Sequence, residues 1–71
     1  MEGELQRVVG RNLARIRRER GLSQERIAND VLGLSTRYVV DIEAGRRNLS
    51  LRVVERLAST LRVTPYELLN P

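Results

Sequence analysis

The 71-residue sequence contains no cysteine, no histidine and no lysine, and its only aromatic residues are Tyr38 and Tyr66. Without cysteine the chain can form neither a disulfide nor a thiolate nucleophile, and the usual ligands of structural zinc are missing. Histidine, the side chain most used for proton transfer near neutral pH, is also missing. Two tyrosines are too few for the stacking platforms with which proteins bind single-stranded nucleic acids.

Long apolar runs are absent too. The chain has neither the run of about 7–15 apolar residues typical of a signal peptide nor the roughly 18 that a membrane span needs. We therefore expect a cytoplasmic protein with no membrane partner. The length allows one small domain, residues 1–71, whose thin core cannot line a deep pocket. We expect no enzyme, and hence no catalytic residues, no metal and no cofactor.

Arginine is the residue that the chain has in excess. All 13 basic residues are arginine, against 9 acidic residues, and the net charge is +4. A guanidinium group forms paired hydrogen bonds with phosphates and guanine edges, so this balance favours a nucleic-acid partner. A GC-rich coding bias would also replace lysine by arginine, so composition alone does not decide. The basic excess lies in residues 1–20 and 44–71, on either side of an acidic middle. This distribution suits a protein that binds phosphates on both sides of an element that reads bases.

Apolar residues recur at steps of three and four, with no sustained period of two, which predicts an all-α fold. Serine N-caps, glycine stops and one proline divide the chain into five short helices. These boundary residues are Gly21, Ser23, Gly33, Ser35, Gly45, Ser50 and Pro65. We expect Leu5 and Leu51 to lie on the inward faces of the first and fourth helices.

A helix-turn-helix pattern occupies the centre of the chain, from Leu22 to Gly45. Ala28 is small, as required where the second helix of the pair crosses close above it. Gly33 permits the left-handed backbone of a tight turn between the helices. Val39 and Ile42 are expected to attach the second helix of the pair to the core.

From about Leu13 to Leu69 the sequence resembles the Cro/phage-repressor type, or XRE-like, helix-turn-helix family. The residues that carry the resemblance are Ile16-Arg17, Gly21-Leu22-Ser23-Gln24, Ala28, Gly33-Leu34-Ser35, Ile42-Glu43, Gly45-Arg46-Arg47-Asn48, Leu57-Ala58, Leu61 and Glu67-Leu68-Leu69. It implies a compact five-helix, lambda-repressor-like domain and a transcriptional regulator that binds double-stranded DNA. Gly33 lies five residues after Ala28, one more than is usual in the family, so either the second helix or the turn is longer.

The resemblance implies that the helix after Ser35 enters the major groove with its N-terminus first. The expected base-reading residues are Thr36, Arg37, Val40 and Asp41. Arg37 best suits guanine, and Thr36 suits either a thymine methyl group or a phosphate. Asp41 has two alternative roles, because it could accept a hydrogen bond from cytosine or orient Arg37 four residues earlier.

Other residues are expected to bind phosphates or to hold the helices together. The expected phosphate-binding residues are Gln24, Ser35, Tyr38, Arg46, Arg47 and Asn48. The ring of Tyr38 is expected to pack beside Ile42, which leaves its hydroxyl group for a phosphate. Arg17 and Glu43 match a partly buried salt bridge that, in relatives, holds the first helix to the recognition helix, so we interpret them as structural.

One recognition helix reads only about four to six base pairs, which is too little for selectivity in a genome. The resemblance therefore implies a homodimer on a palindromic operator. We expect the interface in the fifth helix and the end of the fourth, at Val63, Tyr66, Leu68 and Leu69. RNA polymerase is a further candidate partner. In size and in the run Arg47-Asn48-Leu49-Ser50 the chain resembles controller proteins of restriction-modification systems. A repressor, an antitoxin component and a protein-interaction module with the same fold remain open.

Overall fold

The computed structural model describes residues 3–71, and all regular secondary structure in that range is helical. In chain order the elements are α1 (Glu4–Glu19), α2 (Gln24–Arg26), η1 (Ile27–Leu32), α3 (Thr36–Glu43), α4 (Leu51–Leu61) and α5 (Pro65–Leu69). Helix α2 continues directly into η1, so the two together form the second of the five predicted helices. The predicted all-α fold is confirmed. Among the described helices, none combines the length and the apolar character needed to cross a bilayer.

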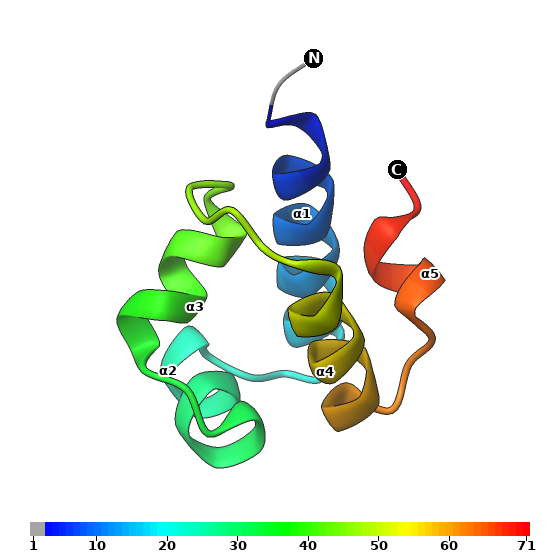
Figure 1. Cartoon of the computed structure of the whole chain (residues 1–71). Coiled ribbons are helices and arrows are strands. Elements are labelled where there is room, and N and C mark those ends of the chain that lie inside the picture. Colours follow the sequence, from blue (N-terminus) through cyan, green and yellow to red (C-terminus); the bar gives the residue numbers. More distant parts are fainter. Residues whose placement is uncertain (1–2) are drawn as a thin grey trace.

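The long helix α1 lies at the centre, with α3 on one side and α5 on the other (Figure 1). Helix α4 contacts α5 and η1 and closes the bundle. Each of the five helices contributes at least one fully buried side chain to the core. These side chains are Leu13, Ile27, Val39, Ile42, Leu61 and Leu68. Burial of this shared core fixes α3, which carries most of the predicted functional residues, against α1.

The helix ends follow the boundary residues that the sequence predicted. The hydroxyl groups of Ser23, Ser35 and Ser50 each accept a hydrogen bond from the backbone N–H three residues later, at 3.0 or 3.1 Å. These bonds satisfy N–H groups that have no partner within the helix. Helix α5 has a cap that was not predicted from the sequence: the Glu67 carboxylate accepts from the backbone N–H of Thr64 at 2.9 Å.

The extra residue before Gly33 is accommodated within the second helix. Element η1 is a π-helix, in which hydrogen bonds run to the fifth residue back rather than the fourth. Accordingly, the backbone N–H of Gly33 donates to the carbonyl of Ala28, and the N–H of Leu34 donates to the same carbonyl at 2.8 Å. Gly33 then turns the chain with φ 66°. The wider helical turn takes up the inserted residue, and the connection to α3 stays short.

Gly10, in the middle of α1, lies close against the backbone at the end of α3. A Cβ atom at this position would lie 2.3 Å from the carbonyl oxygen of Ile42 and 2.8 Å from that of Glu43. No side chain fits there, because the obstacle is backbone rather than a flexible group. Gly10 was not predicted from the sequence, although a glycine inside a helical pattern is a signal of such close contact.

Three apolar residues lie elsewhere than predicted. Leu68 has no exposed surface and packs in the core of its own chain, so its prediction as an interface residue was wrong. Helix α5 packs on α1 and α4, and the Asn12 amide holds it there by donating to the carbonyl of Leu68 at 2.7 Å. Leu5 and Leu51 are 62% and 73% exposed, because they lie in the first turns of α1 and α4, beyond the edge of the core.

Candidate nucleic-acid interface

A partly buried polar network fixes α3 to the two helices before it. The Glu43 carboxylate on α3 accepts from Arg17 Nε at 2.8 Å and from Arg17 Nη2 at 3.1 Å. The side chains of Arg17 and Glu43 are only 13% and 7% exposed. The remaining amino group of Arg17 donates to the carbonyl of Leu22 at 3.0 Å. The structure thus places Arg17 and Glu43 in a two-pronged ion pair between α1 and the end of α3.

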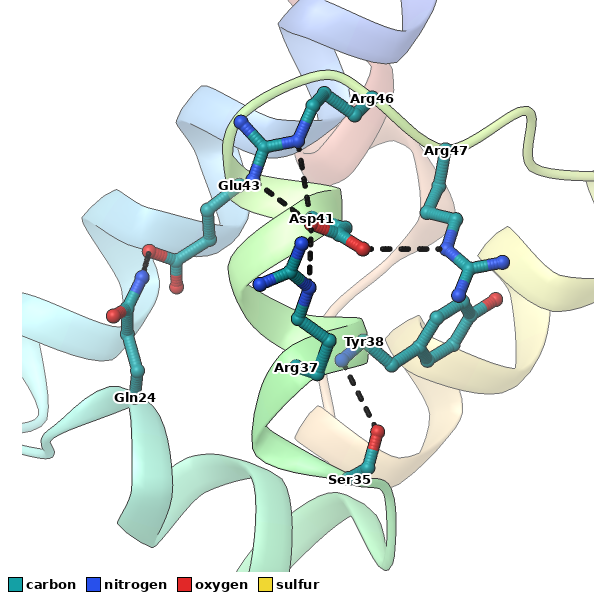
Figure 2. Close-up of polar contacts among 8 residues, drawn as sticks. All are labelled: Gln24, Ser35, Arg37, Tyr38, Asp41, Glu43, Arg46 and Arg47. Atoms are coloured by element: carbon teal, nitrogen blue, oxygen red, sulfur yellow. Dashed lines mark hydrogen bonds and ion pairs between the residues drawn. The ribbon is translucent and has the colours of Figure 1, made fainter.

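Gln24, a predicted phosphate-binding residue, belongs to the same network. Its amide Nε2 donates to Glu43 Oε1 at 3.0 Å, and the residue is half-buried (Figure 2). Only one of its two amide hydrogens is left for another partner. The main contact of the Gln24 side chain is therefore with α3.

On the outer side of α3, Asp41 faces three arginines (Figure 2). Asp41 Oδ1 accepts from Arg46 Nη2 at 2.8 Å and from Arg46 Nε at 3.3 Å. Arg37 Nε lies 3.5 Å from the same oxygen, and Arg47 Nε lies 3.9 Å from Oδ2. The Asp41 side chain is only 15% exposed, whereas that of Arg37 is 80% exposed.

The three arginines also stabilise the charged form of Asp41. The hydrogen bond from Arg46 lowers the pKa of the Asp41 carboxyl group below its usual value, and the charges of all three arginines lower it further. Desolvation of the carboxylate opposes this shift in pKa. The group therefore carries its negative charge throughout the neutral pH range.

Tyr38 contacts both the hydrophobic core and Arg47, one of the three arginines around Asp41. Its ring packs against the core cluster, while the guanidinium carbon of Arg47 lies 4.8 Å from the ring centre. At that distance the cation and the aromatic face attract each other. The backbone N–H of Tyr38 donates to the hydroxyl group of Ser35, the N-cap of α3, at 3.1 Å. We name the surface formed by Arg37, Tyr38, Asp41, Arg46 and Arg47 the arginine cluster.

The remaining predicted residues flank the arginine cluster. Thr36 and Val40 are half-buried on α3, and Ser35 is exposed at its start. Asn48 is exposed on the loop after α3, where its Oδ1 accepts from Gln6 Nε2 on α1 at 3.2 Å. The structure therefore brings the residues predicted on α3 together with the two arginines of the following loop, and holds Gln24 in the separate Glu43 network.

A family model described as helix-turn-helix matches residues 13–68 of the chain. This chain belongs to the XRE-type helix-turn-helix family. It is 40% identical over 68 residues to an uncharacterized HTH-type transcriptional regulator, y4dJ, of Sinorhizobium fredii, and the match covers 96% of this chain and 87% of the relative. The protein is thus a transcriptional regulator with a helix-turn-helix DNA-binding domain.

Two solved structures of this family are similar to the chain along most of its length. The hypothetical transcription factor NHTF from Neisseria superposes with a TM-score of 0.85 at 37% identity, over 100% of this chain and 80% of that one. The restriction-modification controller protein C.AhdI from Aeromonas hydrophila superposes with a TM-score of 0.75 at 40% identity, over 89% of this chain and 94% of that one. The arrangement of helices is therefore similar to that of a hypothetical transcription factor and of a restriction-modification controller protein.

Proposed function

We propose that this regulator binds a palindromic DNA operator as a homodimer, with α3 in the major groove. The observation that supports this most strongly is the arginine cluster, which places three guanidinium groups over the exposed side of α3 and the loop after it. Such groups can bind both phosphates and guanine edges. The similarity over 94% of the controller protein C.AhdI favours a controller-type regulator over an antitoxin component. Contact with RNA polymerase stays a prediction.

Within this proposal Arg37 reads the bases, because it is the most exposed side chain of the ion pairs around Asp41 and lies in the first turn of α3. Thr36 and Val40, half-buried beside it, make the flanking base contacts. The contacts of Asp41 favour the role of orienting Arg37 over that of accepting from cytosine, since both oxygens of Asp41 already face arginines. The proposed phosphate contacts are those of Gln24, Ser35, Tyr38, Arg46, Arg47 and Asn48.

Replacing Arg37 by alanine is expected to relax sequence preference at one position in each half-site. A bidentate contact between arginine and guanine contributes about 1–3 kcal/mol of discrimination against the wrong base. The measurement is selection from random duplex DNA at about 150 mM salt, with wild type and Arg37→Ala in parallel. Arg15→Ala is the matched control, because it removes an arginine that pairs with Glu19 on α1. The proposal is supported if wild type and the control select an inverted repeat and Arg37→Ala selects the same repeat with one degenerate position in each half-site. It is contradicted if wild type enriches no sequence.

An apolar face that is left uncovered supports the homodimer. Leu5, Leu51 and Leu69 line a groove with a cavity of about 150 Å³, bounded by the starts of α1 and α4 and the end of α5. Tyr66 on α5 is 79% exposed. We propose a second copy of the chain as the occupant, because one α3 reads too few base pairs and two-fold symmetry supplies a second. The interface then includes Tyr66 and Leu69 and uses the start of α4 rather than its end. Val63, which follows the end of α4 and packs against the core cluster, lies outside this interface.

Replacing Leu51 by glutamate is expected to weaken the dimer at least about 30-fold, since loss of an interface anchor costs about 2 kcal/mol or more. Leu51 is exposed in the single chain, so Leu51→Glu should leave the fold of the monomer intact. Sedimentation equilibrium at micromolar concentration measures the change. Thr60→Glu, at an exposed position near the other end of α4, is the control with the same change in charge. Wild type that sediments only as a monomer would contradict the proposed interface.

A further inference from the structure

Asp41 is a carboxylate on the surface that the proposed function turns toward DNA. A negative charge there repels phosphates, so by itself it lowers affinity for any duplex. Yet it lies among three arginines rather than apart from them, at 2.8 Å from Arg46, 3.5 Å from Arg37 and 3.9 Å from Arg47. This placement suggests that Asp41 acts through the arginines that it holds.

The contacts of Asp41 join side chains from two parts of the chain. Arg37 lies one helical turn before it on α3, and Arg46 and Arg47 lie on the loop that follows α3. The backbone strengthens the link, because the N–H of Arg46 donates to the carbonyl of Asp41 at 2.9 Å. Arg47 is held from a second side by the ring of Tyr38, 4.8 Å away. Long, flexible side chains that would otherwise sample many rotamers are thus ordered before DNA arrives.

This order affects specific and non-specific binding differently. Asp41 approaches Arg37 at Nε, which leaves the two terminal amino groups of Arg37 for the N7 and O6 atoms of guanine. A phosphate that recruits Arg46 must instead displace a carboxylate that already accepts two hydrogen bonds from it. Asp41 therefore weakens binding that rests on phosphate contacts alone more than it weakens the contact between Arg37 and a correct base.

We propose that Asp41 is a specificity-determining positioning residue, which lowers affinity for unrelated DNA more than affinity for the operator and so raises the preference for the operator. It does this by holding Arg37, Arg46 and Arg47 in one cluster. The inference rests on the proposed function, in which Arg37 reads a base of the operator.

The test compares wild type with Asp41→Asn, which removes the charge and keeps the shape. Asp30→Asn is the matched control, because Asp30 makes a similar ion pair with Arg26 at 2.7 Å on the helix before α3. Binding is measured over a series of salt concentrations to three duplexes. They are the selected operator, the operator changed at the base pair that Arg37→Ala relaxes, and an unrelated sequence.

Asp41→Asn is expected to bind the unrelated duplex about 3–10-fold more tightly, with a salt dependence steeper by about one phosphate contact. Its preference for the operator over the changed operator should fall at least about fivefold. Asp30→Asn should alter affinity for all three duplexes by one common factor. If Asp41→Asn behaves like this control, the inference is overturned while the proposed function stands. If wild type prefers none of the three duplexes, the proposed function fails and the inference fails with it.

A second measurement tests the ordering of the cluster without DNA. In ¹H–¹⁵N spectra of the free protein, the Nε–H groups of Arg37 and Arg46 should be more restricted in motion than that of Arg52, an exposed arginine of α4. Asp41→Asn should make all three alike, and Asp30→Asn should leave the difference in place. Equal mobility of the three groups in wild type would overturn the inference.

Discussion

Replacing Glu43 by alanine is expected to lower the free energy of unfolding by about 3–5 kcal/mol. The carboxylate is almost buried and accepts three hydrogen bonds, two from Arg17 and one from Gln24. Its removal leaves the guanidinium group of Arg17, itself only 13% exposed, without a counter-ion in a poorly solvated place. A chain of this length has a total stability of only roughly 4–10 kcal/mol, so the variant should be close to unfolding at ambient temperature.

Urea unfolding followed by circular dichroism measures the effect of Glu43→Ala. Glu19→Ala is the matched control, because Glu19 pairs with Arg15 at 3.2 Å with both side chains about half exposed or more, and exposed pairs contribute less than about 1 kcal/mol. The double replacement Arg17→Met with Glu43→Leu should be more stable than Glu43→Ala, because it leaves no buried charge unpaired. A loss below about 1 kcal/mol for Glu43→Ala would show that the pair does not hold α3 to α1.

Replacing Gly10 by alanine is expected to destabilise the protein by about 2–3 kcal/mol. Helix propensity alone predicts the opposite sign, since alanine is favoured over glycine by about 1 kcal/mol inside a helix. The contact decides, because the added methyl group would lie 2.3 Å from the carbonyl oxygen of Ile42. The backbone at the end of α3 must move away from α1, and this also strains the ion pair of Arg17 with Glu43.

Thermal unfolding tests this second expectation. Arg11→Ala places the same alanine at the adjacent, exposed position of α1 and should change stability by about 0.5 kcal/mol or less. Since α3 carries the arginine cluster, the folded fraction of Gly10→Ala should also bind the operator more weakly than wild type. A variant that is more stable than wild type would mean that α3 does not approach α1 as closely as the structure shows.

Helix class and helix ends could be predicted from the sequence because both depend on neighbours within a few residues. A serine at the start of a helix caps the N–H group three positions later through a local hydrogen bond, as at Ser23, Ser35 and Ser50. The pairing of Arg17 with Glu43 was predicted only through the family resemblance, since no local rule joins residues 26 positions apart.

The tertiary structure alone decided which apolar residues are covered and which polar groups meet. Leu68 lies in the core and Leu51 outside it, although both occupy apolar positions on their helices. Burial depends on which part of each helix the neighbouring helices cover. Asp41 has one partner at helical spacing that the sequence anticipated, but its partners Arg46 and Arg47 come from a loop that folds back over α3. By itself the sequence determined the helices and the type of domain, through local hydrogen bonds and periodic burial. The packing of α3 on α1, which backbone contact at Gly10 controls, decided how the predicted side chains are arranged.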